Sequence, residues 1–365
     1  MGPSLSLIDF ARLAAWPEHD HEEARAVFRR SCREMLEQGS GFRRPVHFGG
    51  SPSSWRSTCL GSFEAGNARD YFERAFRCYC VHDAERPGGL FTGYYEPEVD
   101  GSRSRSPQFH VPVYRRPADL VAFRDGDKAR SGLDYGRLVD GKALPYLTRR
   151  EIEQGALDGM GLEIVWLRDW ADAFFIQIQG SGRVRLAEGG TLRLSYAAKS
   201  GLPYTAIGAR LVKRGVFAPE AMSMQAIRAW MAQHPGEARE LMWENQSFVF
   251  FREVDLEDPA LGALGAQHVQ LTPRRSLAVD RSLWMFGTPV WLDTRAPVGD
   301  AGRSEPFRQL LVAQDTGSAI RGPARGDVYW GFGDAAAAIA GPMKSTGSMA
   351  VLLPLDVAEE LGLSR

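Results

Sequence analysis

Two aspartates near the C-terminal end are the residues of this sequence best placed to do chemistry. Asp315 ends an apolar run and opens the segment Asp-Thr-Gly-Ser, and Asp327 stands further on, between Gly326 and the aromatic pair Tyr329 and Trp330. Apolar surroundings raise the pKa of a carboxyl group, so that it holds its proton near neutral pH. Such a group can protonate the leaving oxygen when a glycosidic bond breaks. The two aromatic residues would also offer flat faces to a sugar ring.

The Asp-Thr-Gly-Ser segment resembles the active-site loop of aspartic proteases, in which two such loops hold paired aspartates that share one proton. A chain of that kind needs a second copy, and the nearest candidate, Asp293–Arg295, lacks the glycine that the loop requires. Dimeric enzymes with one loop per subunit have far shorter chains. Asp315 can equally end a strand and accept backbone N–H bonds in a turn. An aspartic protease built on Asp315 is therefore kept as the alternative enzyme.

Motifs for other catalytic mechanisms are missing from the sequence. It contains no His-Glu-x-x-His and no Gly-x-Ser-x-Gly, and its seven histidines are scattered. The glycines of Gly180–Gly182 and Gly189–Gly190 are followed by no lysine at the spacing of a phosphate loop, so we interpret them as hairpin turns. Carboxylates are the best chemical candidates, and we predict neither a metal ion nor a cofactor.

The elements that must hold these residues are mostly short strands joined by glycine, proline and polar turns. Residues 173–186 read as a strand in which Gln177 and Gln179 alternate with isoleucines, so that both amides would face one side. Such a face suits sugar hydroxyls, and it suits plain solvent as well. Helices are expected over 20–38, where Asp20 and Glu23 form a capping-box-like start, and over 68–80, 204–214 and 223–233. Further strands are expected over 162–169, 191–201, 245–253, 269–280, 288–294, 307–317, 327–333 and 349–355.

Composition limits the class of protein. A chain of 365 residues is long enough for two domains, and its net charge of −1 argues against a dedicated binder of nucleic acid or anionic membranes. No apolar run is long enough to span a bilayer. The first residues lack the charged and apolar regions of a signal peptide, so the protein is cytoplasmic or the chain begins after a removed signal. The spacing of the four cysteines shows no disulfide framework or zinc site, and we expect free thiols.

Several segments together resemble the membrane-bound lytic murein transglycosylase A family. The segments are FTGYYEP at 91–97, FFIQIQGSGRVRL at 174–186, TAIG at 205–208, NQSFVFF at 245–251, SLAVDR with GTPVWLD, and QDTGSAIRGPARGDVYWGFG at 314–333. The resemblance implies a mainly β protein with a few peripheral helices. It implies a double-psi β-barrel catalytic domain from residues 1–105 and 246–365, and a second β-barrel inserted at 106–245. A peptidoglycan glycan strand would bind in the cleft between them.

The same resemblance implies the reaction. The family cleaves the β-1,4 bond between N-acetylmuramic acid and N-acetylglucosamine without water and leaves a 1,6-anhydro end. Asp327 matches the aspartate that serves as acid and then as base, and Asp315 matches a supporting residue nearby. The expected substrate contacts are Gly93, Tyr94, Gln179, Ser181, Tyr196, Gln314 and Tyr329. We expect a monomer in the periplasm or cell envelope that needs no cofactor or metal, binds no nucleic acid, and works on glycan strands alongside other murein-synthesising or murein-degrading proteins.

The sequence departs from the family pattern at two places. Arg281 stands where relatives often have a proline, and Met285–Gly287 stands in place of a Pro-Leu-Gly, which affects the expected shape of that turn. The lipoprotein signal and its modified cysteine do not occur in the sequence, so the family's outer-membrane anchoring is not carried over. A glycan-binding cell-wall protein without turnover is the non-enzymatic alternative.

Overall fold

The computed structural model describes residues 4–85, 87–123, 126, 128, 132–219, 222–255, 258–298 and 302–363. The chain divides into two compact units. The first unit is built from both ends of the chain, Met1–Tyr95 and Asp258–Arg365, and the second unit is Glu96–Glu257. The insertion expected at 106–245 lies inside the second unit. Each unit is described below by itself.

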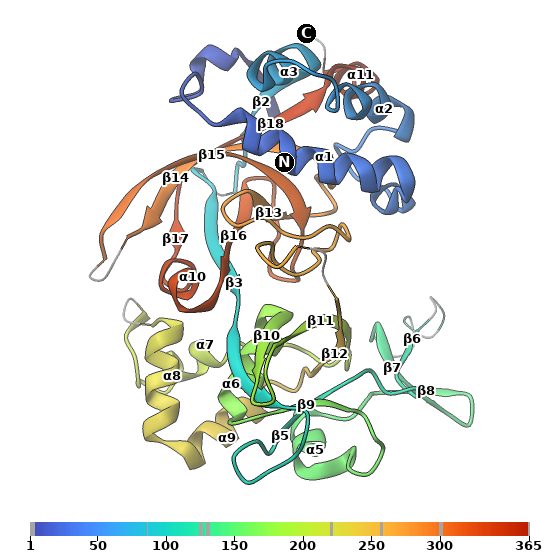
Figure 1. The fold of residues 1–365 in the computed structure, drawn as a ribbon, viewed down its shortest axis with the longest axis vertical. Helices are drawn as coiled ribbons and strands as arrows, with labels where there is room; N and C mark the ends of the chain where they lie inside the picture. The colour runs from blue at the N-terminus through green and yellow to red at the C-terminus, as the bar shows by residue number, and fades with distance from the viewer. Residues whose placement is uncertain are drawn as a thin grey trace. The chain divides into compact units, whose positions relative to one another are not determined.

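A nine-stranded sheet forms the framework of the first unit and contains strands from both ends of the chain, with the N-terminal strand β3 between two C-terminal ones (Figure 1). Strand β13 (Ser276–Val279) runs parallel to one neighbour, β15 (Ser304–Asp315), and antiparallel to the other, β16 (Arg325–Phe332). The order of the strands is β1-β2-β18-β14-β15-β13-β16-β3-β17. The remaining strands are β1 (Ser4–Ile8), β2 (Phe76–His82), β3 (Leu90–Glu96), β14 (Pro289–Pro297), β17 (Lys344–Ser345) and β18 (Ser348–Pro354).

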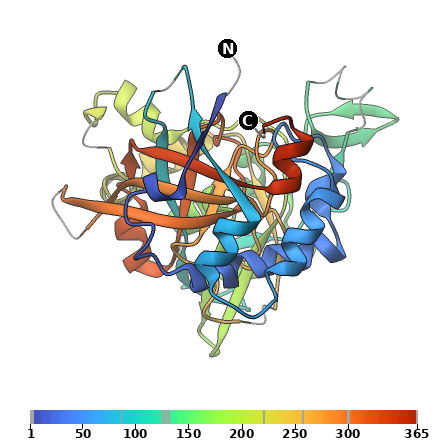
Figure 2. The same cartoon turned by 90° about the horizontal axis from the view of Figure 1, so that it is seen from above.

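Helices from both ends of the chain pack beside this sheet. Figure 2 shows the N-terminal helices, in blue, next to the C-terminal helix α11, in red. The expected helix over 20–38 is confirmed as α1 (His21–Glu37), because Asp20 accepts a hydrogen bond from the Glu23 backbone N–H at 3.0 Å and Gly39 leaves the helix with φ 55°. The other helical segments are η1 (Phe10–Arg12), η2 (Ser40–Arg43), α2 (Pro52–Gly61), α3 (Ala68–Ala75), α10 (Gly333–Ala340) and α11 (Leu355–Glu360).

Two expectations for this unit are wrong. The helix expected over 68–80 ends at Ala75, and β2 begins at Phe76, because Cys78 and Tyr79 pair in register with β18 in the core of the sheet. The cysteines are not all free thiols. Cys32 of α1 and Cys59 of α2 form a disulfide between two fully buried positions with Cα atoms 5.1 Å apart, a pairing that the sequence spacing gave no means of seeing.

The second unit contains a six-stranded sheet and a separate three-stranded sheet. An isolated bridge joins Phe251 of β12, one outermost strand of the larger sheet, to Arg115, which directly follows β5, the other outermost strand. The larger sheet has the order β12 (Val249–Glu253), β11 (Thr191–Lys199), β10 (Ser181–Leu186), β4 (Glu98–Ser102), β9 (Glu163–Leu167) and β5 (Val111–Tyr114). The smaller sheet is β6 (Val121–Ala122), β7 (Tyr135–Val139) and β8 (Lys142–Leu144). The helical segments are α5 (Arg149–Glu151), the π-helix η3 (Ile152–Ala156), α6 (Trp170–Gln179), α7 (Ile207–Lys213), α8 (Met224–Gln233) and α9 (Pro235–Trp243).

The strand expected over 173–186 is half wrong, because its first part is helix α6. Asp169 caps the helix by accepting a hydrogen bond from the Asp172 N–H at 2.8 Å, and Gly180 ends it with φ 77°. The helix packs between two cores: Ile176 belongs to the core under the sheet, and Phe174 belongs to the core formed with α7 to α9. Apolar residues on both sides hide the helical period, so the run could not be told from a buried strand.

The mainly β class is confirmed, although the helices are more numerous than the sequence indicated. Within the described residues, the strand order of each sheet is linear and does not close on itself. The sheets therefore do not by themselves show the β-barrels that the resemblance implies. Among the helices of the described residues, none combines the length and apolar character that crossing a bilayer requires.

Candidate active site

The register of the nine-stranded sheet places both aspartates on one face. Ala278 on β13 is the partner of Asp315 on β15 and also the partner of Asp327 on β16. Residues paired across neighbouring strands point to the same face of a sheet. The two carboxylates therefore flank Ala278, whose methyl group takes little space between them.

A β-bulge brings Asp315 into this register. Leu277 on β13 pairs with Ala313 and the next residue, Ala278, pairs with Asp315, so Gln314 is the extra residue of the bulge. Without it, Gln314 would stand opposite Ala278. Bulges of this kind re-aim a side chain next to a functional site.

The Gln314 side chain is fully buried, and its hydrogen bonds hold the bulge in place. Its amide oxygen accepts from the Ser276 hydroxyl at 2.6 Å, and its amide nitrogen donates to the Ser31 hydroxyl of α1 at 2.8 Å. We expected Gln314 as a substrate contact, but the structure gives it no exposed surface. Its position is that of a residue that sets the aspartate geometry.

Strand β3 supplies the hydroxyl group that contacts Asp327. The Thr92 hydroxyl donates to Asp327 Oδ1 at 2.5 Å, and Thr92 itself accepts from Arg325 Nη2 at 2.8 Å. Because the arginine occupies a lone pair of the hydroxyl, the Thr92 proton is directed toward the carboxylate. The three residues thus form a relay from a buried guanidinium through a hydroxyl to the acid.

Burial raises the pKa of the Asp327 carboxyl toward the range of a general acid. It raises the pKa of Asp327 to about 6, and the negative charge of Asp315 acts in the same direction. The Thr92 hydrogen bond and the Arg325 charge lower this pKa, but burial is the larger effect. The side chain is only half-buried by surface area, so the group is desolvated and still accessible to a reactant.

Asp315 is held by neutral donors. The Tyr94 hydroxyl donates to Asp315 Oδ2 at 2.8 Å, and the Ala266 backbone N–H donates to Oδ1 at 2.9 Å. Burial raises the pKa of Asp315, while these hydrogen bonds lower it. Burial and the neighbouring aspartates also raise the pKa of Tyr94, which keeps its phenol protonated as a donor. Asp315 is thus fixed in position on both of its oxygens.

The aromatic residues near Asp327 desolvate the site rather than presenting open faces. Tyr329 is 1% exposed and Trp330 is 8% exposed. The Tyr329 ring lies 5.3 Å from the Tyr94 ring at a tilted angle, and Trp330 packs against Phe307. A Cβ at Gly93 would lie 2.7 Å from the Trp330 ring, so this glycine is required by close packing. The expectation that Tyr329 and Trp330 offer free faces to a sugar is therefore wrong, and only the dry environment is confirmed.

The other expected contacts belong to the second unit. Gln179 is the last residue of α6, and Ser181 is the first residue of β10, where it pairs with Ser195. Tyr196 on β11 is 41% exposed. Gln177, which the strand interpretation placed on an open face beside Gln179, is buried. The structure thus groups Tyr94, Asp315, Asp327 and Tyr329 in the first unit and Gln179, Ser181 and Tyr196 in the second.

Three residues of the site escaped the sequence analysis: Thr92, Ala278 and Arg325. The alternation of Thr92 with Tyr94 in one strand could have indicated that both face the aspartates. The role of Ala278 depends on long-range pairing and leaves no local signal. Within the described residues, no group of three or more histidine, cysteine, aspartate or glutamate side chains could hold a metal ion.

Comparison with known domain families gives two matches. Residues 90–252 match the MltA specific insert domain, and residues 275–353 match the 3D domain. The second match contains both aspartates, and the first contains β3 with Thr92 and Tyr94.

Relatives with the same architecture are known. The chain is 35% identical to membrane-bound lytic murein transglycosylase A of Vibrio cholerae over 261 residues, which are 71% of this chain but only 63% of that protein. It is 32% identical to the Escherichia coli K12 protein of the same name over 291 residues, 79% of this chain and 72% of the relative.

Solved structures agree. The crystal structure of a membrane-bound lytic murein transglycosylase from Agrobacterium tumefaciens matches with a TM-score of 0.86 at 32% identity, covering 98% of this chain and 99% of that one. E. coli MltA with bound chitohexaose matches with a TM-score of 0.67 at 27% identity, covering 96% and 90%. These matches, together with the two domain matches, show that the chain belongs to the membrane-bound lytic murein transglycosylase A family.

Proposed function

We propose that this protein is a lytic transglycosylase that cleaves the β-1,4 bond between N-acetylmuramic acid and N-acetylglucosamine in peptidoglycan and leaves a 1,6-anhydro end. The observation that carries the proposal is the half-buried Asp327 carboxyl, whose pKa burial raises to about 6. At pH 7 a group with this pKa is protonated in about one molecule in ten, and it is still a competent base after it has given up its proton. The names of the relatives support the substrate class.

In the first step, Asp327 acts as a general acid. Thr92 donates to Oδ1, so the transferable proton is carried by Oδ2. That proton passes to the glycosidic oxygen as its bond to C1 of the muramic acid breaks, and the N-acetylglucosamine side leaves as an alcohol. Asp327 is then a carboxylate, stabilised by the Thr92 hydroxyl and the Arg325 charge.

In the second step, the same group acts as a base. The C6 hydroxyl of the muramic acid attacks C1 and gives its proton to Asp327, which closes the 1,6-anhydro ring and restores the acid. Because the attacking hydroxyl belongs to the sugar itself, its effective concentration is high and neither a water nor a second catalytic carboxylate is needed. Asp315 supports the reaction through its charge, which raises the pKa of Asp327.

Contacts to the glycan are proposed from both units. In the first unit, Tyr94 is half-buried and contacts Asp315, and in the second unit Gln179, Ser181 and Tyr196 are at least partly exposed. The E. coli MltA structure with bound chitohexaose supports an oligosaccharide of N-acetylated sugars as the ligand. Gly93, Gln314 and Tyr329 act indirectly, through packing and position, in this proposal.

We further propose that the protein works in the cell envelope. The relatives are named membrane-bound, and the Cys32–Cys59 disulfide is typical of an oxidising compartment such as the periplasm.

We also propose that the first unit contains a double-psi β-barrel and that the second unit contains a β-barrel. The parallel pairing of β13 with β15 and the bridge between Arg115 and Phe251 support this proposal.

Digestion of purified murein sacculi tests the reaction. We expect the wild-type protein to release 1,6-anhydro-muropeptides, identified by mass, and Asp327→Asn to release none. Products with a reducing-end hydroxyl would mean hydrolysis and would contradict the mechanism. Wild-type rates from Asp327→Asn would remove this residue from its role. Binding without any product would favour a glycan-binding protein, and peptide cleavage that Asp315→Asn abolishes would favour the protease.

A further inference from the structure

Two exposed polar side chains lie on a firmly held surface of the second unit. Tyr204 is 55% exposed, and Gln246 is exposed between two buried neighbours, Asn245 and Ser247. Neither side chain hydrogen-bonds to another group in the described part of the chain. Exposed side chains on backbone that a rigid scaffold holds in place are the kind that commonly contact ligands.

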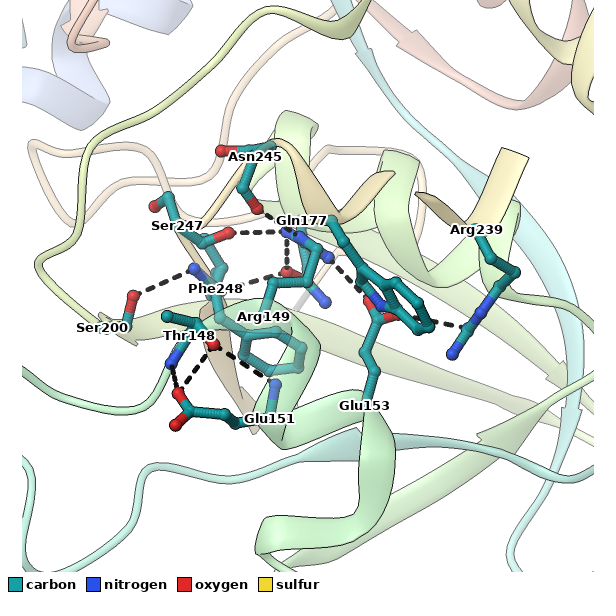
Figure 3. Close-up of polar contacts among 12 residues, drawn as sticks. Thr148, Arg149, Glu151, Glu153, Gln177, Ser200, Arg239, Asn245, Ser247 and Phe248 are labelled. Carbon is teal, nitrogen blue, oxygen red and sulfur yellow. Dashed lines mark hydrogen bonds and ion pairs between the residues drawn. The ribbon is translucent and has the colours of Figure 1, made fainter. Parts of the chain in front are cut away.

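Arg149 binds the backbone of Asn245 and Ser247, the residues on either side of Gln246 (Figure 3). Its guanidinium donates to the carbonyl oxygens of Asn245 at 3.0 Å and of Ser247 at 2.7 Å, and its own backbone N–H donates to the carbonyl of Gln246 at 3.1 Å. One buried residue therefore binds three consecutive carbonyl groups. Arg149 is only 1% exposed, and its guanidinium also lies over the rings of Phe174 and Phe248.

The charge of Arg149 is compensated inside the unit. Arg149 donates to Glu153 Oε1 at 3.1 Å, and Glu153 Oε2 receives both the Trp243 indole N–H at 2.9 Å and the Arg239 guanidinium at 3.1 Å. We call Arg149, Glu153, Gln177 and Arg239 the Arg149 network. The network has two guanidinium groups for one carboxylate, and its hydrogen bonds stiffen the backbone above it.

The same segment also holds the backbone next to Tyr204. The Asn245 side-chain oxygen accepts from the Thr205 backbone N–H at 3.1 Å, so the residue after Tyr204 is tied to the residue before Gln246. Asn245 is itself 1% exposed. Tyr204 and Gln246 are thus displayed from two chain segments that a single hydrogen-bonded unit keeps together.

Gln177 connects this surface to the end of helix α6. Its side-chain oxygen accepts from Arg149 Nη2 at 2.8 Å and from the Val249 N–H at 3.1 Å. Two residues later α6 ends at Gln179, and Ser181 follows at the start of β10. The network therefore also positions the turn that carries two of the proposed glycan contacts.

We propose that Tyr204 and Gln246 form an additional contact surface for an N-acetylated glycan, positioned by Arg149. The inference rests on the proposed function and names a further site for the same substrate class. A tyrosine ring can cover the C–H face of a pyranose, and a primary amide can both donate to and accept from an acetamido group or a hydroxyl. A neutral, preorganised surface suits an uncharged sugar because little conformational entropy is lost on binding.

Binding of chitohexaose to the 365-residue chain tests the surface directly. The parent is Asp327→Asn, which removes turnover, and affinity is measured by titration calorimetry. We expect Tyr204→Ala to weaken binding about tenfold and Gln246→Ala about threefold. Tyr204→Phe keeps the ring and should stay within about twofold of the parent. Phe63→Ala, which removes an exposed aromatic side chain from the first unit, is the matched control and should leave affinity unchanged.

The outcomes separate this inference from the proposed function. If wild type releases anhydro products and the parent binds chitohexaose, but Tyr204→Ala and Gln246→Ala bind as tightly as the parent, the additional surface is wrong and the enzyme stands. If wild type releases no product and the parent does not bind, the proposed function fails and the surface fails with it. Unchanged glycan binding with loss of binding to a protein from the cell envelope would assign the surface to a protein partner instead.

Arg149→Lys tests the positioning role. Lysine keeps the charge but cannot span the carbonyls of Asn245 and Ser247 together. In a variant that still unfolds cooperatively, we expect KM to rise about fivefold on soluble glycan strands while kcat and the midpoint of its pH profile stay near wild type. A fall in kcat with unchanged KM would contradict a role in glycan positioning.

Discussion

Each unit contains a cluster of buried ionisable groups, and the two clusters are built in opposite ways. In the first unit, Asp315 and Asp327 accept hydrogen bonds from neutral donors, and burial raises the pKa of both. In the second unit, the Glu153 carboxylate forms ion pairs with Arg149 and Arg239 and accepts hydrogen bonds from Arg149 and from the Trp243 indole. The Arg149 network thus has two guanidinium groups for one carboxylate, whereas the two aspartates have a single guanidinium, that of Arg325, nearby.

The comparison indicates that the number of positive charges around a buried carboxylate decides whether that carboxylate serves catalysis or holds the structure rigid. A buried carboxylate with full compensation stays ionised and holds structure together. A buried carboxylate with partial compensation holds its proton up to a higher pH and can exchange it with a reactant. The following substitutions test this contrast, beginning with the largest expected effect.

Asp327→Asn should have the largest effect, a fall in lytic activity of about a thousandfold, because acid and base are lost together. The same change should stabilise the first unit at neutral pH. The folded-state pKa of Asp327 lies above its ordinary value of 3.8, so its contribution to stability is complete below pH 3.8 and is lost as the pH rises through 6. At pH 8 the gain should be about 1–2 kcal/mol in urea unfolding, and it should vanish near pH 3. A variant that is less stable than wild type at pH 8 would contradict the account.

Glu153→Gln should act in the opposite direction. Removal of one charge from a compensated network leaves Arg149 and Arg239 without their carboxylate and should cost about 3 kcal/mol of unfolding free energy. Glu237→Gln, at an exposed position of α9, is the control and should change stability by less than about 0.5 kcal/mol. Equal effects of the two substitutions would show that the network contributes little.

Thr92→Val should reduce kcat about tenfold, because Asp327 loses its hydrogen-bond donor and the Arg325 guanidinium loses its acceptor. The hydroxyl lowers the pKa of Asp327, so its removal should raise that pKa and move the descending limb of the activity profile to higher pH. Thr92→Ser, which keeps the hydroxyl, should return the descending limb to the pH at which it lies in the wild type. An unmoved limb in Thr92→Val would exclude the relay.

Tyr94→Phe should have the smallest effect, a loss of activity of about threefold. Without the phenol the pKa of Asp315 rises, and a more neutral Asp315 repels the charge of Asp327 less. The limb should therefore shift slightly to lower pH, opposite to the shift in Thr92→Val. A shift in the same direction would mean that Tyr94 acts on Asp327 by another route.

Much of the site could be predicted from the sequence because its signals are local. Asp315 and Asp327 stand in glycine-containing segments beside apolar residues, and the N-terminal cap of helix α1 is formed by residues close together in the sequence. The dry surroundings of Asp327 also follow from its neighbours in the chain. The low exposure of Tyr329 and Trp330 could not be predicted from neighbouring residues, because it depends on how β3 and the rest of the sheet pack over them.

The errors share a physical cause, which is dependence on distant partners. Helix α6 reads as a strand because it contacts two cores, and β2 reads as a helix because its pairing with β18 overrides local propensity. The bulge at Gln314 and the place of Ala278 between two aspartates arise only from pairing across the sheet. Arg149 gives no sequence signal at all, since each carbonyl that it binds lies far along the chain.

Direct titration of the Asp327 carboxyl is the measurement that tests the central claim. Protein labelled with carbon-13 at aspartate side chains would be followed by NMR from pH 3 to pH 8, and the Asp327 signal assigned by its loss in Asp327→Asn. We predict a midpoint near pH 6, which the limb of the activity profile should match. A midpoint near the ordinary value of 3.8 would leave fewer than about one carboxyl in a thousand protonated at pH 7 and would contradict its role as the proton donor.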